Sequence, residues 1–335
     1  MMPLWLLGVL LMSWGLTGGV RRYALARSLL DVPNARSSHA VPTPRGGGLA
    51  IVLAFLAVLP ILAVEDVLPW PAMWALLGGG VWVAALGFLD DHGHVAARWR
   101  LLGHFIAAAW VLAWLGGLPP LRVADVPLEL GWLGHGLALV GLVWLLNLYN
   151  FMDGIDGIAA VEAICVSFGG ALIYGILGHH AMIWAPLALG VAVLGFLYWN
   201  FPPARIFMGD VGSGFLGLIL GAMALQAVWV ANELLWAWLI LLGVFVVDAT
   251  WTLLRRLLRW ERVYEAHRSH AYQFASRRCN RHLPVTLAVA LLNLLWLWPL
   301  ATVVALGYLE GVVGVFIAYI PLGWLAWHFK AGVTE

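Results

Sequence analysis

Charge and cysteine are both scarce in this chain. Only 10% of its 335 residues are Asp, Glu, Lys or Arg, 63% are hydrophobic, and the mean hydropathy is +0.92. About half of the residues of a typical soluble domain are apolar, so this composition excludes a soluble globular protein. The two cysteines, Cys165 and Cys279, fall in an apolar run and in a polar loop, which argues against a disulfide between them.

The apolar residues form long runs that contain few charges. Runs of about 18 to 25 such residues are typical of transmembrane helices. The first run lacks a basic leading region and an Ala-x-Ala cleavage site, so we interpret it as a retained helix rather than a signal peptide. We predict an all-α polytopic membrane protein, with one domain over residues 1–335 and about eleven spans, near 1–20, 46–64, 70–89, 101–118, 131–148, 158–177, 181–199, 212–230, 234–254, 283–307 and 311–329.

Basic residues are divided very unequally between the two sides of these spans. If successive loops alternate in side, 17 of the 18 Lys and Arg residues share one side and only Arg122 lies on the other. The shared side holds Arg21, Arg22, Arg27, Arg36, Arg45, Arg98, Arg100, Arg205, eight arginines between residues 255 and 281, and Lys330. The positive-inside rule makes this side cytoplasmic, with the N-terminus outside and the C-terminus inside.

All the polar motifs fall in loops assigned to the cytoplasmic side. They lie in five loops: residues 34–39 and 42–48 in the first, then residues 90–100, 147–157, 200–214 and 267–270. They contain the aspartates Asp90, Asp91, Asp153, Asp156 and Asp210. A miscounted span would place some of these loops on opposite sides. Their common side therefore predicts one composite site at the cytoplasmic face.

The residue types in these motifs indicate the chemistry of that site. Carboxylates with Asn carbonyls and no Cys suit Mg²⁺ or Mn²⁺ and disfavour a thiolate zinc site. Mg²⁺ is usually held by one or two carboxylates together with substrate phosphates, so some of the five aspartates must orient ligands, bind substrate or accept a proton. Neighbouring glycines admit anionic groups close to backbone N–H groups, and arginines at this face match phosphate oxygens.

Each motif, taken alone, also has a structural interpretation. Asp90 and Asp91 could be a solvated pair, Asp153 and Asp156 could cap a turn, and Asp210 could cap a helix. His267 and His270 could be surface residues of an arginine-rich loop. Glu162 and Asp248, within predicted spans but near the interface, are assigned to structural support. The functional interpretation depends on the convergence of the motifs, which none of these alternatives predicts.

In their order along the chain, these motifs resemble the bacterial polyprenyl-phosphate N-acetylhexosamine-1-phosphate transferase family (glycosyltransferase family 4). The resemblance runs from about Asn34 to Gln273. Its most specific parts are residues 147–157, with Asn147, Asn150, Asp153 and Asp156, and residues 207–213, with Phe207 and Asp210. It implies ten or eleven helices, a cytoplasmic active-site cleft, Mg²⁺ dependence, a UDP-amino-sugar donor and undecaprenyl phosphate as acceptor, hence a place in the bacterial inner membrane.

The resemblance also implies roles for individual residues. Asn150 and Asp210 would contact the metal, Asp90 and Asp91 would face the lipid phosphate, and Phe207 and Asp156 would recognise uracil. The full catalytic set is Asp90, Asp91, Asp153, Asp210 and His267. The substrate-binding set is Arg45, Arg98, Arg100, Asn147, Asp156, Asn200, Phe207, Arg268 and His270.

One departure from the family concerns the donor sugar. Much of the family carries three clustered histidines in the loop where this chain has His267, Arg268, Ser269 and His270. This pattern resembles the subgroup that primes O-antigen-type polysaccharides. The reaction implied is attack of the lipid phosphate on the β-phosphorus of a UDP-N-acetylhexosamine, which releases UMP; a covalent aspartyl-phosphate route is disfavoured because the acceptor is already mostly dianionic at neutral pH.

Two other classes of protein remain as alternatives. A secondary transporter would also show about eleven spans, but it should carry ionisable groups at mid-bilayer and repeated halves, which this sequence lacks. A CDP-alcohol-type phosphotransferase needs an Asp-Gly-x-x-Ala-Arg run followed by two further spaced aspartates. Here Val161 follows Asp156-Gly-Ile-Ala-Ala, and no such series of aspartates comes after it. We expect no nucleic-acid partner, and whether the chain forms a homodimer stays open.

Overall fold

The computed structural model describes residues 2–33, 41–93, 95–123, 126–261 and 267–333. The predicted motif at residues 34–39, with Arg36, and the basic Arg262 lie outside the described residues. The helices are α1 (Met2–Ala26), α2 (Gly48–Val64), α3 (Trp70–Gly93), α4 (Ala97–Leu115), α5 (Gly131–Met152), α6 (Ile158–Ile176), η1 (His180–Ile183), α7 (Trp184–Asn200), α8 (Asp210–Val228), α9 (Asn232–Leu241), α10 (Gly243–Leu258), α11 (Ala271–Cys279), α12 (Leu283–Leu292), η2 (Asn293–Leu297), α13 (Trp298–Ala305) and α14 (Gly311–His328).

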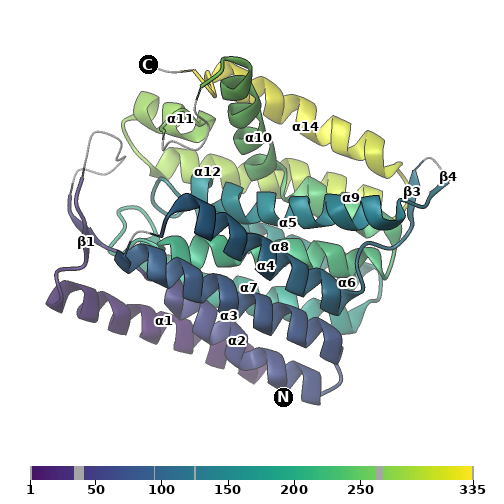
Figure 1. Ribbon diagram of the computed structural model, residues 1–335, viewed down its shortest axis with the longest axis horizontal. Coiled ribbons are helices and arrows are strands. Elements are labelled where there is room, and N and C mark those ends of the chain that lie inside the picture. Colours follow the sequence, from purple (N-terminus) through teal and green to yellow (C-terminus); the bar gives the residue numbers. More distant parts are fainter. Residues whose placement is uncertain (1, 34–40, 94, 124–125, 262–266, 334–335) are drawn as a thin grey trace.

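The only strands among the described residues form two short antiparallel hairpins. One joins β1 (Leu30–Asp31) to β2 (Thr43–Pro44), and the other joins β3 (Leu121–Val123) to β4 (Val126–Leu128). The remaining architecture is a bundle of long helices (Figure 1). The predicted all-α membrane class is therefore confirmed.

The number of spans differs from the prediction. Within the described ranges, eight helices are long and apolar enough to cross a membrane, or nine if α9 and α10 form one span. These two helices are bent by 71° at Leu242, so the predicted span 234–254 is broken. The predicted spans at 46–64 and 101–118 correspond to α2, which has 17 residues, and α4, whose first turn carries two arginines. Eleven spans and their orientation remain predictions.

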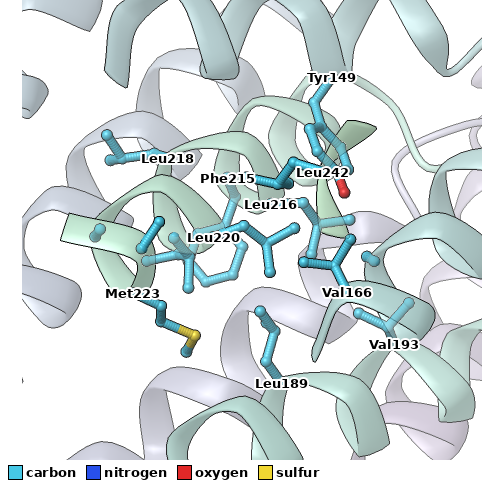
Figure 2. Packing of buried hydrophobic residues seen from close by; sticks show 14 of the residues in the cluster. Tyr149, Val166, Leu189, Val193, Phe215, Leu216, Leu218, Leu220, Met223 and Leu242 are labelled. Atoms are coloured by element: carbon cyan, nitrogen blue, oxygen red, sulfur yellow. The ribbon is translucent and has the colours of Figure 1, made fainter. Parts of the chain in front are cut away.

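Helix α8 is the centre of the bundle. Of an 18-residue stretch of α8, 94% of the residues are buried inside the protein, compared with 17% for a stretch of the same length in α1. Its side chains Phe215, Leu216, Leu220 and Met223 pack against residues of neighbouring helices, such as Tyr149 of α5 (Figure 2). Apolar surface on every side is what a helix needs when it has no lipid-facing side. The core therefore holds the helix whose first residue is the candidate metal ligand Asp210.

Small residues let the surrounding helices approach α8 closely. A Cβ on Gly48 would collide with the backbone of Gly212, and a Cβ on Gly87 would lie 2.6 Å from the carbonyl oxygen of Asp210. Without a hydrophobic driving force between helices in lipid, such close backbone contacts are a main source of helix association. They bring the N-termini of α2 and α8 and the C-terminal part of α3 to one end of the bundle.

Two acidic residues within apolar helices support the structure. Oδ1 of Asp248, in α10, accepts a hydrogen bond from the backbone N of Ala271 (2.9 Å), and its Oδ2 accepts one from Tyr272 N (3.1 Å), which caps α11. Glu162 Oε2 accepts a hydrogen bond from Asn293 Nδ2 (2.7 Å). These contacts agree with the structural role predicted for both residues.

Candidate active site

Asp210 is the first residue of α8 and the meeting point of the motifs. Gly209, which precedes it, has a φ of +77°, in the left-handed region that residues with a Cβ seldom adopt. A Cβ on Gly209 would also lie 2.7 Å from Oδ2 of Asp91. Glycine is therefore needed for α8 to begin this close to α3.

Asp91, near the C-terminal end of α3, caps the N-terminus of α8. Its Oδ1 accepts a hydrogen bond from Asp210 N (3.1 Å) and its Oδ2 accepts one from Val211 N (3.2 Å). The first N–H groups of a helix have no intrahelical partner and lie at the positive end of its dipole, so a carboxylate there is stabilising. Asp91 thereby fixes the position of Asp210.

Two arginines join the carboxylates into one network. Nη2 of Arg45 lies 2.8 Å from Asp91 Oδ1 and 2.6 Å from Asp210 Oδ1. Arg100, in the first turn of α4, forms an ion pair with Asp90, and its Nη1 lies 3.8 Å from Asp210 Oδ2. Three carboxylates thus face two guanidinium groups, so the network has an excess of negative charge that suits a further cation.

A cavity of about 230 Å³ opens on one side of Asp210. It is lined by Asp153, which follows α5 and makes no hydrogen bond or ion pair with the rest of the described chain. Burial raises the pKa of the Asp153 carboxyl well above its ordinary value; Arg45 opposes this shift, and the nearby Asp210 adds to it. Nδ2 of Asn150, also in the lining, donates to Ser213 Oγ (3.2 Å). Carboxylates that lie close enough to raise one another's pKa are suited to binding a cation.

Beyond Asp156 this cavity adjoins a wider one of about 640 Å³. Asp156, Phe207 and His282 line both. Oδ2 of Asp156 accepts a hydrogen bond from Ala204 N (3.0 Å), and its Oδ1 lies 3.1 Å from Nδ1 of His282. The wider cavity also has a basic lining, which consists of Arg268, Arg277 and Arg281. Together the two cavities form what we call the wide chamber.

A much smaller cavity of about 40 Å³ lies on the other side of Asp210, and we call it the narrow chamber. Its lining shares Asn150 and Asp210 with the wide chamber. Its other polar residues come from three helices and are Asp90 of α3, Arg100 and His104 of α4, and Asn147 of α5. Asp210 and Asn150 therefore stand in the wall between a small polar chamber and a large one.

Known proteins are similar to this chain over much of its length. Residues 73–228 match the model of Glycosyl transferase family 4. A probable undecaprenyl-phosphate N-acetylglucosaminyl 1-phosphate transferase of Bacillus subtilis is 30% identical over 261 residues, which cover 76% of this chain and 71% of that protein. The chain belongs to glycosyl transferase family 4.

Two other relatives show similar identity. A phospho-N-acetylmuramoyl-pentapeptide-transferase of Symbiobacterium thermophilum is 30% identical over 256 residues, 71% of this chain and 75% of that protein. A decaprenyl-phosphate N-acetylglucosaminephosphotransferase of Mycolicibacterium smegmatis is 29% identical over 231 residues, 63% of this chain, and the match spans 56% of that relative's length. The family match includes all five predicted aspartates but ends before His267.

The two predicted histidines of this family member lie beside the chambers. Neither His267 nor His270 is among the residues that line the narrow or the wide chamber. His270 is 3% exposed, and its ring stacks on His267, with 4.9 Å between ring centroids. Burial, together with the neighbouring His270 and Arg256, lowers the pKa of His267 to about 3, so His267 is neutral at pH 7.

Two predicted substrate-binding residues have other surroundings. Arg98 is exposed, its guanidinium lies 5.5 Å from the ring of Trp99, and it lines neither chamber. Asn200 lines the wide chamber, but both ends of its amide are occupied by backbone: Oδ1 accepts from Gly157 N (3.0 Å) and Nδ2 donates to Ile206 O (2.9 Å). Its role is to tie the segment after α7 to the turn that carries Asp156.

The structure also brings forward residues that sequence reasoning did not select. Ser213, Gln273 and His282 line the wide chamber, and His104 lines the narrow one. His104 stands four residues after Arg100 on α4, one helical turn on the same side, and this spacing was a signal that could have identified it. His282 follows the candidate motifs in a basic stretch and offers no comparable signal.

The donor atoms around Asp210 fit the divalent cation that the family implies. Asp153, Asp210, Asn150 and Ser213 supply hard oxygen atoms, and no cysteine lines either chamber. No group of three or more His, Cys, Asp or Glu side chains in the described ranges forms an all-protein metal cage. This pattern suits Mg²⁺, which is usually held by one or two carboxylates and by substrate phosphates.

Proposed function

We propose that this protein transfers an N-acetylhexosamine 1-phosphate from a UDP-sugar to undecaprenyl phosphate and releases UMP. The observation that carries the proposal is the arrangement of two chambers that meet at Asp210 and Asn150. A transfer between two phosphorylated substrates needs two adjacent sites that share their charge-stabilising groups. The names of the relatives, which include polyprenyl-phosphate sugar transferases, agree with it.

In the proposal, the wide chamber binds the nucleotide sugar. Phe207 offers a ring on which uracil stacks, and Asp156, held by Ala204 N and close to His282, recognises the base. The basic residues Arg268, Arg277 and Arg281 supply positive charge around the donor. The volume of the wider cavity, about 640 Å³, is in the range of small-molecule sites.

The narrow chamber binds the acceptor phosphate. Arg100, already paired with Asp90, lies at the start of α4, where a lipid headgroup arrives from the side. A phosphate there can take the place of one carboxylate as the partner of Arg100. Asp90 then orients the acceptor, and a strong general base is not required because a phosphate monoester is mostly dianionic at pH 7.

In the reaction, an acceptor oxygen forms a bond to the β-phosphorus as the bond to the leaving UMP oxygen breaks. Mg²⁺ or Mn²⁺, when bound, neutralises the charge that develops on the pyrophosphate. Asp210, Asn150 and Asp153 are the protein groups that would hold it. Arg45 keeps Asp210 in place through its ion pair, and Asp91 keeps α8 in register, so the phosphates meet a fixed arrangement.

The proposed location is the bacterial inner membrane, with the site on the cytoplasmic side. The sorting of basic residues supports this orientation, and a cytosolic nucleotide sugar with a membrane-bound acceptor requires it. The proposed product is the first lipid-linked intermediate of a surface polysaccharide of the O-antigen type, on the sequence pattern at His267. An N-acetylmuramoyl-pentapeptide donor is the rival, because a relative of similar identity is named for that substrate.

A substrate panel tests the proposal. The full chain, reconstituted with Mg²⁺ and undecaprenyl phosphate, is given UDP-N-acetylhexosamines or UDP-N-acetylmuramoyl-pentapeptide, and release of UMP is followed. We expect UMP release with at least one N-acetylhexosamine donor, and only when the acceptor is present. Release with the pentapeptide donor alone would reassign the substrate. No release with any donor, together with uptake of a solute into vesicles, would favour the transporter alternative.

A further inference from the structure

A groove between α1 and α7 carries features that the transfer reaction does not use. It has a volume of about 770 Å³ and is lined by apolar side chains such as Leu10, Trp14 and Leu194, together with Arg205. The two helices pack along each other at the edge of the bundle (Figure 1). The groove faces outward, where Leu11 is 55% exposed and Tyr198 is also 55% exposed. Its occupant in a membrane is therefore a lipid or another membrane protein.

Two arginines stand at one end of this groove. Nε of Arg21 donates a hydrogen bond to the carbonyl oxygen of Arg205 (3.2 Å). The guanidinium of Arg205 lies 5.3 Å from the ring centroid of Tyr198 and 5.7 Å from that of Trp199. In the described part of the chain, neither arginine forms an ion pair with a carboxylate. Arg21 thus lies at the backbone of Arg205, beside the groove, and neither positive charge has a carboxylate partner among the described residues.

The distance from the groove to Arg21 is close to the depth of one membrane leaflet. From Leu10, in the groove lining, to Arg21, beyond its charged end, α1 rises by roughly 17 Å, and half of a hydrocarbon core measures about 15 Å. The groove lining contains no acidic residue. An apolar groove below Arg205, with Arg21 beyond it, matches an acyl chain below a phosphate. Aromatic residues at the charged end, such as Trp199, are typical of the membrane interface.

The groove is linked to the wide chamber through one chain segment. Pro202 and Pro203 line both the groove and the wide chamber. In the same segment, Ala204 N donates to Asp156 Oδ2 (3.0 Å), and Asn200 binds Gly157 N (3.0 Å). A ligand that restrains Arg205 therefore also restrains the adjacent backbone N of Ala204, which binds Asp156.

We propose that this groove binds one anionic phospholipid, with an acyl chain along α1 and α7 and its phosphate between Arg21 and Arg205. The bound lipid holds residues 200–206 in the shape that presents Asp156. The acceptor lipid is a different molecule, because the groove shares no lining residue with the narrow chamber, where the acceptor phosphate must meet Asp210. The effect on donor binding rests on the proposed function, whereas the lipid site itself does not.

Direct lipid binding is the first test, and it needs no enzymatic activity. The purified full chain is titrated with phosphatidylglycerol or phosphatidylcholine, and retained lipid is counted by native mass spectrometry. We expect the affinity for phosphatidylglycerol to be higher than that for phosphatidylcholine by about tenfold or more, since each arginine near an anionic headgroup adds attraction. Arg21→Gln with Arg205→Gln should abolish that preference, and Arg205→Lys with native Arg21 should keep most of it.

The matched control removes two other arginines at the same end of α1. Arg22→Gln with Arg27→Gln removes the same charge from residues that are exposed and do not line the groove. It should leave the phosphatidylglycerol preference unchanged. Equal binding of the two lipids by the native chain, or equal loss in both double variants, would overturn the site. A Leu11→Cys variant tests a rival occupant. If it forms a disulfide-linked dimer, a second copy of the chain occupies the groove instead of a lipid.

Steady-state kinetics in lipid nanodiscs then test the link to Asp156. Replacing phosphatidylglycerol by phosphatidylcholine should raise the KM for the UDP-sugar severalfold and leave kcat and the acceptor KM nearly unchanged. The Arg21→Gln, Arg205→Gln variant should show the raised KM in both lipids. An unchanged KM would overturn the link while the lipid site stands. Absence of transfer with every donor would instead count against the proposed function.

Discussion

The narrow and wide chambers differ in how their charges are balanced. In the narrow chamber, Asp90 is already paired with Arg100 inside the protein. In the wide chamber, Asp153 has no such partner in the described structure, and burial raises the pKa of its carboxyl. The Asp90 carboxylate is therefore balanced without a ligand, whereas the Asp153 carboxylate is left to a cation or a proton. Under the proposed function, that positive charge would arrive with the donor and its metal ion, and the acceptor phosphate would replace one partner of Arg100.

The largest expected effect is at Asp210, which belongs to both chambers. Asp210→Asn keeps the size of the side chain and removes its charge, so it weakens both the metal contact and the ion pair with Arg45. We expect kcat to fall by about a hundredfold or more, as when a charge-stabilising group is removed from other active sites. UMP release measures it, and an unchanged thermal unfolding transition is the control. Near-normal turnover at limiting Mg²⁺ would exclude Asp210 as the metal ligand.

A substitution of Asp153 tests whether its carboxylate lacks a partner in the wide chamber. A carboxyl whose folded-state pKa is raised destabilises the fold as pH rises above its unfolded value of 3.8. Asp153→Asn removes this penalty. We therefore expect the variant to have a higher Tm than the native chain at pH 7 and no such advantage near pH 4, while kcat falls by about tenfold or more. Mg²⁺ should raise the Tm of the native chain more than that of the variant.

The opposite result at Asp153 has a clear meaning. If the Tm of the variant were lower than that of the native chain at every pH, the carboxylate would have a stabilising partner. Asp153 would then be paired within the protein as Asp90 is, and the contrast between the two chambers would be lost. Asp156→Asn is a useful comparison, because that carboxylate already accepts a hydrogen bond from Ala204 N.

One pair of variants separates the two chambers by substrate. Arg100→Ala should raise the KM for undecaprenyl phosphate by about tenfold and leave the KM for the UDP-sugar nearly unchanged. Phe207→Ala should do the reverse. Loss of a contact made equally in the ground and transition states changes KM more than kcat, so steady-state kinetics with each substrate varied in turn distinguish them. If both variants weakened the same substrate, the chambers would have to be reassigned.

His104 should give the smallest effect. It lines the narrow chamber one helical turn from Arg100, and its Nδ1 is buried. His104→Leu should raise the acceptor KM by about threefold, the size expected for one modest hydrogen bond, with the donor KM unchanged. His104→Gln restores a polar group and should return the acceptor KM most of the way to the native value. Equal KM values for both variants would show that only the volume of the side chain matters.

The helical membrane class and much of the site could be predicted because both depend on local patterns. Long apolar runs identify membrane helices directly, and motifs that follow such runs on one side must converge, as Asp153 and Asp210 do. The sequence did not reveal the 71° bend between α9 and α10, since no proline marks it and the apolar run continues through it. The predicted count of about eleven spans also included α2, which has 17 residues, and α4, whose first turn carries two arginines.

Partners that are distant in the chain were beyond prediction. The oxygens of Asp91 accept bonds from the first turn of α8, and the amide of Asn200 joins two backbone segments. Nothing in the residue type separates these structural contacts from ligand contacts. Arg98 and Arg100 look equivalent in sequence, yet only Arg100 reaches the site, because they lie on different sides of α4. Such differences depend on which helix packs opposite each residue.

The seam between Gly48 and Gly212 restricts how this protein can evolve. Neither position has room for even a methyl group beside the other backbone, and Gly212 stands two residues after Asp210. Any substitution at either position would push α2 and α8 apart beside Asp210. If the proposed function holds, substitutions in the basic lining around Arg268 and Arg281 could change the donor one residue at a time. Gly48 and Gly212 could not be substituted in this way, so new specificity would arise around a fixed pair of helices.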